Sequence, residues 1–313
     1  MKTYSSKINA IKKRVASLRN EIFKAATNGT HHKVFVSNKF AIRFRQENPR
    51  LLQREANFLK QLNHPLVPKI LHELKIDDSL AIIENRLPGQ TIDTLWKNLT
   101  PANQTNIIKQ QLEFLNFLRN QKKNQVYSVN SGKQYSDFFV CLNDELDQKT
   151  INIKKFKPAN ELLNKLLRVI NETSIKKLFR SKKFTLVHGD LIVHNLLTDG
   201  KNLTGVLDWE LAFFGDPDYD LFRLFYYQEC AKAYKEQGTD ETFESDYMNK
   251  LIAAIRKSDL IKNINAFQRK FRFVRAIFYI NALDWAVKSN NPKSNVKELI
   301  ELWDKKRVKH SNA

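Results

Sequence analysis

The pattern of apolar residues changes close to residue 88, and this change limits the fold more than any other feature of the sequence. Before it, short runs rich in β-branched and aromatic residues lie between turn residues, which is typical of strands. Four strands are expected there, at His31–Val36, Lys39–Arg45, Lys69–Lys75 and Leu80–Glu84. Strands joined in pairs by tight turns predict a small antiparallel sheet.

Two helices are expected among these strands. Apolar residues recur at three- and four-residue spacings through residues 5–26, which predicts an amphipathic helix. Asn48 and Pro49 supply an N-cap and a first turn for a second helix, whose apolar stripe runs from Leu51 to Leu62. Strand, strand, helix, strand and strand together form a small α+β lobe.

Arg86–Gln90 contains a Pro and a Gly that interrupt both periodicities, so a hinge is expected there. Most of the chain beyond it is expected to be helical, at residues 101–121, 158–180, 217–236, 242–257, 264–289 and 293–307. Three short strands interrupt this helical part, at 184–187, 195–198 and 203–207.

The fold class expected from this order of elements is α+β, with a small antiparallel-sheet N-lobe and a larger helical C-lobe. The expected domains are an N-terminal helix over residues 1–26, an N-lobe over 27–90 and a C-lobe over 91–313. Two lobes of this kind are expected to share a cleft.

Length and cysteine content favour a soluble intracellular protein. The chain has 313 residues, enough for a large core, and its two cysteines, Cys141 and Cys230, are too few for a disulfide framework. Its longest apolar runs are far shorter than a membrane span, and its N-terminus lacks the pattern of a signal peptide. A cytoplasmic protein is expected, monomeric or weakly dimeric and with no membrane partner.

The charge is distributed unevenly along the chain. The formal net charge is +20, but residues 184–246 carry 4 basic and 13 acidic residues. A basic face could bind a phosphate polymer. The lysines are scattered, however, so a solvated surface is favoured and no nucleic-acid partner is expected. The acidic segment is more informative, because it would attract cationic ligands and Mg²⁺.

Three polar side chains in the acidic segment follow short apolar strands. Asp190, Asn195 and Asp208 lie where these strands end, so they are expected to point into one cleft. Phosphoryl transfer from a nucleotide needs one carboxylate to orient the attacking hydroxyl, and an amide and a second carboxylate as oxygen ligands of Mg²⁺. The expected catalytic loop is 188–195, and the expected metal-binding segment is 207–210.

The sequence around these residues resembles a known family. The runs His188-Gly-Asp-Leu-x-x-x-Asn195, Leu207-Asp-Trp-Glu and Gly215-Asp-Pro-x-x-Asp-Leu are similar to motifs of the aminoglycoside phosphotransferase and choline kinase-like family. The resemblance covers about residues 27–225. It implies a bilobal protein-kinase-like fold that transfers the γ-phosphoryl group of ATP, with GTP as the alternative, to an alcohol hydroxyl. It also implies a requirement for Mg²⁺.

The resemblance implies a role for each matching residue. Asp190 matches the family's catalytic aspartate, and Asn195 and Asp208 match its metal ligands. Three further residues are expected to be structural: His188 within the loop, Asp216 as an N-cap before a proline, and Asp220 as a brace of the catalytic loop.

The N-lobe is expected to hold the nucleotide. Alternation places Arg43 and Arg45 on one face of their strand. Arg43 matches the family's strand lysine, and an arginine keeps the charge and can contact phosphates through two N–H groups. Glu55 matches the helix glutamate that pairs with this cation. The other expected contacts come from a reduced phosphate-covering loop and from hinge backbone that would hydrogen-bond the purine: Asn28, Gly29, Thr30, Glu84 and Arg86.

A small molecule is expected as acceptor, rather than a peptide. Asp208 and the helix near Pro217 are only nine residues apart, which is too short for the activation segment with which a protein kinase receives a peptide. An aminoglycoside or related antibiotic is favoured, because Leu-Asp-Trp-Glu-x-Ala-x-x-Gly-Asp-Pro resembles those enzymes best. The carboxylates expected to bind such a polycation are Glu210, Asp218 and Glu229.

Two alternatives remain open. A choline- or ethanolamine-like metabolite would need an aromatic cage around its cationic group. Candidates for this cage are Trp209, Phe213, Phe214, Tyr219, Tyr226, Tyr227 and Trp285. The non-enzymatic alternative is an inactive pseudokinase or a basic nucleic-acid-binding module, against which the complete set of Asp190, Asn195 and Asp208 argues.

Overall fold

The computed structural model describes residues 4–26, 33–45, 49–77, 79–127, 133–144, 146–180, 183–236 and 242–310. The chain divides into two units. The first unit consists of Met1–Gln111 and Asp190–Ala212, and the second of Leu112–Gly189 and Phe213–Ala313. The expected metal ligands therefore belong to the same unit as the N-terminal sheet.

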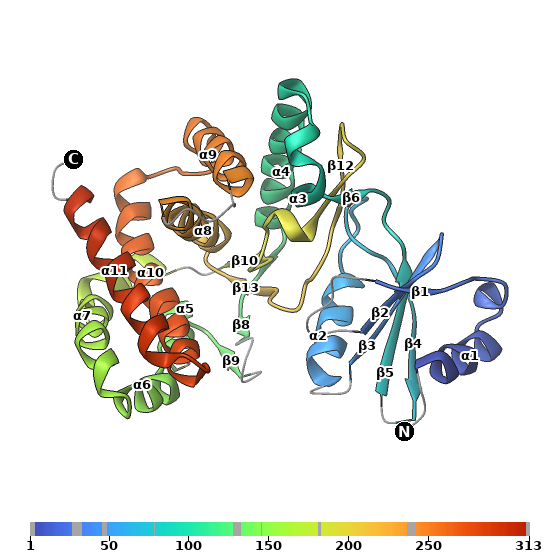
Figure 1. The fold of residues 1–313 in the computed structure, drawn as a ribbon, viewed down its shortest axis with the longest axis horizontal. Coiled ribbons are helices and arrows are strands. Elements are labelled where there is room, and N and C mark those ends of the chain that lie inside the picture. The colour runs from blue at the N-terminus through green and yellow to red at the C-terminus, as the bar shows by residue number, and fades with distance from the viewer. Residues whose placement is uncertain are drawn as a thin grey trace. The chain divides into compact units, whose positions relative to one another are not determined.

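The first unit contains a five-stranded antiparallel sheet with the strand order β1-β2-β3-β5-β4 (Figure 1). Its strands are β1 (Lys24–Ala25), β2 (Lys33–Val36), β3 (Phe40–Arg45), β4 (Ile70–Ile76) and β5 (Ser79–Asn85). The four expected strands are confirmed within their described residues, and β1 is an addition to them. The expected antiparallel sheet is therefore present, with β3 in its middle.

Helices cover the two faces of this sheet, one on each side (Figure 1). α1 (Tyr4–Arg14) packs on the face that carries Ile42 and Phe44. α2 (Pro49–Leu59) packs on the opposite face, where its Leu52 and Ala56 contact Ile82. Because side chains alternate along a strand, Arg43 and Arg45 of β3 share the α2 face.

The expected helix over residues 5–26 is only partly correct. α1 ends at Arg14, because Val15 adopts an extended backbone with φ −116° and ψ 103°. The short 3₁₀ helix η1 (Ala16–Leu18) then buries Leu18, while Ile22 is 79% exposed. The apolar spacing arose because these side chains pack against the sheet. A turn can bury such side chains as well as a continued helix can.

A second, smaller sheet completes the first unit. It joins β6 (Gln90–Thr91), β11 (Leu196–Thr198) and β12 (Leu203–Val206) in the order β12-β11-β6, which links the end of the N-terminal half to the segment after the catalytic loop. Short helices lie beside it: α3 (Ile92–Leu95), η2 (Trp96–Asn98) and η5 (Val193–Asn195).

The second unit is mostly helical. Its sheet has the order β13-β10-β7, with β7 (Lys122–Lys123), β10 (Phe184–Val187) and β13 (Phe213–Gly215). A separate two-stranded pair is formed by β8 (Val126–Tyr127) and β9 (Gln134–Tyr135). Its helices are α5 (Phe138–Asp144), α6 (Asp147–Lys154), η3 (Lys157–Ala159), α7 (Asn160–Ile170), η4 (Thr173–Phe179), α8 (Tyr219–Glu236), α9 (Thr242–Lys257), α10 (Ile264–Lys288) and α11 (Pro292–His310). The boundary between the units falls inside α4 (Pro101–Asn120).

Most expected helices of the second unit are present, with one clear error. The helix expected over 158–180 is wrong, because α7 ends at Ile170 and a 3₁₀ helix follows. Ile175 and Phe179 are buried at a four-residue spacing, so the apolar pattern continues where the α-helix does not. α5 and α6 were not expected, since each is too short for a periodicity to be clear. Within the described ranges, no helix is both long and apolar enough to cross a bilayer.

Gly89, at the expected hinge, allows β6 to approach β11 closely. Its φ is +103°, and a Cβ added there would lie 2.5 Å from the carbonyl oxygen of Thr198. Gly200 has a similar φ of +91°, but its added Cβ would meet no atom closer than 4.0 Å. The two glycines therefore separate the cost of backbone strain from the cost of a steric clash.

We expect Gly89→Ala to lower the free energy of unfolding by about 3 kcal/mol or more, because it adds overpacking to backbone strain. Gly200→Ala should cost only about 1–2 kcal/mol, from strain alone. Urea denaturation of both variants measures the difference. Equal losses would show that the close approach at Gly89 does not constrain the fold.

Candidate active site

A cavity of about 1010 Å³ within the first unit brings together residues that are far apart in the sequence. Its lining comes from β3, α2, β5, the residues after β5, the expected catalytic loop and the segment after β12. A volume of this size suits a small-molecule or nucleotide ligand. The expected site residues in its lining are Arg43, Glu55, Glu84, Arg86, Asn195 and Asp208.

Arg43 is buried between two carboxylates in this cavity. Its Nη1 donates to Glu55 Oε1 at 2.8 Å, and its Nε lies 3.5 Å from Glu84 Oε2. Burial alone would lower the pKa of Arg43, but attraction by Glu55 and then Glu84 raises it. The expected ion pair between Arg43 and Glu55 is therefore present, and the arginine keeps its charge.

Glu55 has a second contact, with the segment that follows β12. The backbone N–H of Trp209 donates to Glu55 Oε1 at 2.9 Å, and Oε1 is the same atom that accepts from Arg43. Glu55 is fully buried. One carboxylate oxygen thus fixes both the arginine and the residue next to Asp208.

Asp208 has an unusual backbone conformation. Its φ is 60°, in the left-handed region, which costs a non-glycine residue about 1–2 kcal/mol, with Asp and Asn among the residues that tolerate it best. On its other side, the N–H of Leu207 donates to the carbonyl oxygen of Asn195 at 2.8 Å. Such strain persists only where neighbouring contacts hold it, and it is common at functional sites.

The expected catalytic loop is held in a tight turn by its own hydrogen bonds. Asn195 Nδ2 donates to both the carbonyl oxygen and Oδ2 of Asp190, each at 2.9 Å. The N–H of Ile192 donates to Asp190 O, and that of Asn195 to Ile192 O. Because the amide nitrogen of Asn195 makes these contacts, its oxygen Oδ1 is not needed to close the loop.

Asn195 and Asp208 fit the chemistry of a magnesium site. Both supply oxygen atoms, which Mg²⁺ prefers, and the Leu207–Asn195 bond holds the two segments side by side. Mg²⁺ is usually bound by one or two protein oxygens together with substrate phosphates and water. Within the described residues, no group of three or more His, Cys, Asp or Glu residues is placed to hold a metal ion by themselves.

Arg86 is more constrained than the sequence suggested. Its backbone N–H donates to Lys39 O at 2.8 Å, and its Nη1 donates to Ser37 O at 2.8 Å. Both contacts fix the turn between β2 and β3. A purine contact through the backbone of Arg86 would therefore use its carbonyl group, and this contact stays a prediction. The expected phosphate-covering residues, Asn28, Gly29 and Thr30, lie outside the described residues.

In the second unit, Asp220 holds the start of the catalytic loop. Its Oδ2 accepts the N–H of His188 at 3.0 Å, and its Oδ1 accepts that of Gly189 at 2.8 Å. Gly189 has φ 84°, which lets the two N–H groups converge on one carboxylate. Burial raises the pKa of Asp220, although these contacts oppose the shift. This geometry is what a bracing role requires.

Asp216 differs from the expected N-cap. α8 begins at Tyr219, and the carboxylate of Asp216 accepts instead from the N–H of Asp218 at 3.0 Å, which forms a turn before the helix. Asp216 is also ion-paired with Lys270 at 2.8 Å. Burial raises the pKa of Asp216, and Lys270 opposes this.

The carboxylates expected to bind an acceptor all have basic partners. Glu210 pairs with Arg45 at 2.7 Å, Asp218 with Arg119 at 2.9 Å, and Glu229 with Arg275 at 2.7 Å. The sequence did not indicate these partners, because each is far from its carboxylate along the chain. Of these basic partners, only Arg45 was indicated by the sequence, because alternation places it on the same strand face as Arg43.

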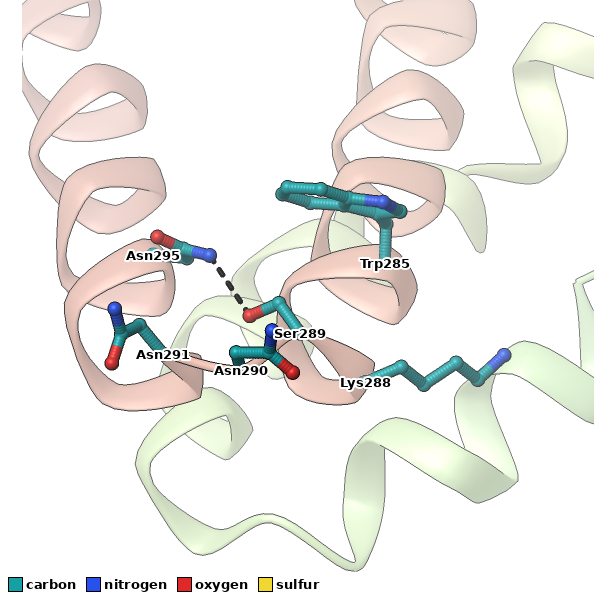
Figure 2. A pocket seen from close by; sticks show the side chains of 6 residues that line it. All are labelled: Trp285, Lys288, Ser289, Asn290, Asn291 and Asn295. Atoms are coloured by element: carbon teal, nitrogen blue, oxygen red, sulfur yellow. Dashed lines mark hydrogen bonds between the residues drawn. The ribbon is translucent and has the colours of Figure 1, made fainter. Parts of the chain in front are cut away.

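Four of the aromatic residues expected as candidates for a cage differ in their exposure. Trp209, Phe213 and Phe214 are buried in the core. Trp285 is exposed and lines a separate cavity of about 400 Å³ between α10 and α11. Figure 2 shows that Asn295 from α11 also faces this cavity and donates to Ser289 at the end of α10, at 2.8 Å. Its lining contains no carboxylate.

A buried arginine paired with a helix glutamate, beside an Asp190–Asn195 loop and Asp208, defines a kinase-like phosphotransferase. The comparison with protein families agrees and is more specific. Residues 24–247 match the family described as "Phosphotransferase enzyme family". The chain belongs to this family.

Solved structures with a similar fold include aminoglycoside phosphotransferases. One is a thermostable mutant of APH(4)-Ia in a ternary complex with ADP and hygromycin B, with a TM-score of 0.66 and 14% identity over 93% of this chain and 96% of that chain. Another is ADP-bound APH(2'')-Ib, with a TM-score of 0.56 and 15% identity over 95% of this chain and 96% of that one. The bilobal kinase-like fold is therefore confirmed.

A curated relative shares one stretch of sequence. The Hygromycin-B 4-O-kinase of Escherichia coli is 36% identical over 52 residues, which is 17% of this chain. The match spans 15% of the length of that relative. It is a local similarity.

We expect Glu55→Gln to lower the free energy of unfolding by about 3–5 kcal/mol, because it removes the charge that faces a buried arginine. Glu73→Gln, in β4, is the matched control. Glu73 pairs with Lys60, the residue after α2, at 2.6 Å in a partly exposed position, so its loss should cost at most about 1 kcal/mol. Chemical denaturation of both variants measures this, and similar losses would contradict the prediction.

Proposed function

We propose that the protein is a magnesium-dependent kinase that transfers the γ-phosphoryl group of ATP, with GTP as the alternative donor, to a hydroxyl group of an aminoglycoside. The observation that carries the proposal is the meeting of Arg43, Asn195 and Asp208 in one cavity of the first unit. These are a phosphate-binding cation and two oxygen ligands, which are the parts that phosphoryl transfer requires.

Arg43 would bind the phosphates of the nucleotide. Glu55 and Glu84 keep its guanidinium charged and fix its direction. An arginine offers several N–H groups in a plane, which suits phosphate oxygens. Asn195 and Asp208 would hold Mg²⁺, which when bound neutralises the charge on the phosphates.

Asp190 would orient the acceptor hydroxyl. The amide of Asn195 donates to Asp190 Oδ2 and sets the plane of the carboxylate. The hydroxyl would donate a hydrogen bond to this carboxylate while its oxygen attacks the γ-phosphorus and the bond to the β-γ bridging oxygen breaks. The proton passes to Asp190 as the new phosphate ester forms.

The aminoglycoside acceptor rests on similarity. The structure of APH(4)-Ia holds hygromycin B, and the local sequence match is to a hygromycin kinase. The ion pairs of Glu210, Asp218 and Glu229 argue that other groups would contact the acceptor. Burial of Trp209, Phe213 and Phe214 weakens the choline-like alternative, since a cage needs exposed ring faces.

We also propose that the protein works in the cytoplasm as a monomer or weak homodimer. Both cysteines are free thiols, Cys141 buried and Cys230 partly buried. Free thiols are usual in a reducing compartment, where ATP is also abundant.

Purified protein should release ADP from ATP when one particular acceptor is supplied. The assay compares hygromycin B, other aminoglycosides, macrolides, choline, ethanolamine and sugar alcohols. Turnover with an aminoglycoside supports the proposal, and turnover with choline alone assigns the metabolite alternative. No phosphoryl transfer to any acceptor, with Mg²⁺-nucleotide binding also absent, would overturn the assignment of a kinase.

Asp208→Ala should raise the Mg²⁺ concentration needed for half-maximal nucleotide binding by about 100-fold or more, because a charged ligand is lost. Asp208→Asn tests whether backbone strain explains the loss, since Asn tolerates a left-handed conformation. Both variants should be impaired, as measured by titration of Mg²⁺ with a non-hydrolysable ATP analogue. A normal Mg²⁺ requirement in Asp208→Asn would contradict a role for the charge.

Asp190→Asn should lower kcat by about 10²–10⁴-fold, the usual size of a general acid–base contribution. Nucleotide affinity should change far less, because Asn195 and Asp208 remain. Asp199→Asn is the control, since Asp199 accepts backbone N–H groups in an exposed turn after β11. Near-normal turnover of Asp190→Asn on the true acceptor would refute its catalytic role.

A further inference from the structure

The segment Leu207–Ala212, called here the Asp208 segment, has no regular secondary structure. It contains the left-handed residue Asp208, so contacts outside the segment must hold it. Two of these contacts, Leu207 to Asn195 and Trp209 to Glu55, lie directly beside Asp208. A third group of contacts is centred on Glu210.

Glu210 is held at two separate points. Its Oε2 accepts from Nη1 of Arg45, the last residue of β3, at 2.7 Å. Its carbonyl oxygen accepts a hydrogen bond from Nη2 of Arg54 on α2. The side chains of Arg45 and Glu210 are 12% and 17% exposed, so water screens their ion pair only weakly.

These contacts use the same sheet face and helix as the nucleotide site. Arg43 and Arg45 both point from β3 toward α2, and each is paired with a carboxylate. Glu55 and Arg54 are neighbours on α2. The Asp208 segment is therefore fixed to β3 and α2 at two points, one and two residues after the metal-ligand candidate.

We infer that Glu210, through Arg45 and Arg54, is a positioning residue that holds Asp208 for metal binding, and this rests on the proposed function. A glutamate carboxylate is also a suitable contact for a cationic acceptor. The carboxylate of Glu210, however, already accepts a hydrogen bond from Arg45. Hydrogen bonds to charged groups are stronger and more directional than neutral ones. Groups that orient a metal ligand usually change metal affinity by 10–100-fold when removed.

The test measures the Mg²⁺ concentration that gives half-maximal binding of AMP-PNP to the full chain. Glu210→Gln and Arg45→Gln should each raise it by about 10-fold. Binding of AMP-PNP in EDTA should not change, because Arg43 and the cavity remain. In the active enzyme, kcat should fall at subsaturating Mg²⁺ and recover at high Mg²⁺, while the KM for the acceptor stays the same.

Glu73→Gln is the matched control. Glu73 also links a strand to the α2 region by an ion pair, at a similar exposure of 21%, but it does not contact the Asp208 segment. Its Mg²⁺ requirement should equal that of the wild type. An equal shift in Glu73→Gln and Glu210→Gln would mean a general loss of stability and would overturn the inference.

A double-mutant cycle tests the pair even if one variant folds poorly. If Arg45 acts through Glu210, Glu210→Gln combined with Arg45→Gln should shift the Mg²⁺ requirement no more than either change alone. Arg45→Lys, which keeps the charge, should recover part of the shift. Additive shifts in the cycle would overturn the inference.

The remaining outcomes separate the inference from the proposed function. An unchanged Mg²⁺ requirement in Glu210→Gln with a raised acceptor KM would assign Glu210 to acceptor binding and overturn the positioning role alone. If wild-type protein shows no Mg²⁺-dependent binding of AMP-PNP, the proposed function fails and the inference fails with it.

Discussion

The buried ion pair between Arg43 and Glu55 is the interaction on which the rest of the site depends. Moving two charges out of water costs free energy, so such a pair persists only when further contacts satisfy both groups. Glu84 supplies one for the arginine, and the N–H of Trp209 supplies one for the glutamate. The pair therefore connects the sheet, helix α2 and the residue beside Asp208 in one set of contacts.

The sequence allowed strands β2–β5 and helix α2 to be predicted closely, because each of them buries one regular face. The prediction failed where apolar side chains are buried but the backbone is not α-helical. Val15 and Leu18 are buried beyond the end of α1, and Phe179 is buried in a 3₁₀ helix. Apolar spacing reports which side chains are buried, and a turn can bury the same side chain as a helix.

The components of the candidate site and its Arg43–Glu55 ion pair were expected from the sequence, but its contacts between more distant segments were not. Asp190, Asn195 and Asp208 lie in recognisable motifs, and Arg43 and Glu55 match the strand cation and the helix glutamate of the family that the sequence resembles. The Arg45–Glu210 pair joins residues 165 positions apart. No local pattern indicates such a contact, so Glu210 was expected to meet the acceptor. Likewise, sequence order does not reveal that residues 190–212 join the first unit.

A single oxygen atom, Glu55 Oε1, accepts from both Arg43 and Trp209. Hydrogen bonds weaken steeply when donor and acceptor move apart or out of line. A displacement of α2 would therefore release the side chain of Arg43, the proposed phosphate contact, and the backbone beside Asp208, the proposed metal ligand, at the same moment. The two proposed nucleotide contacts therefore depend together on the position of one short helix.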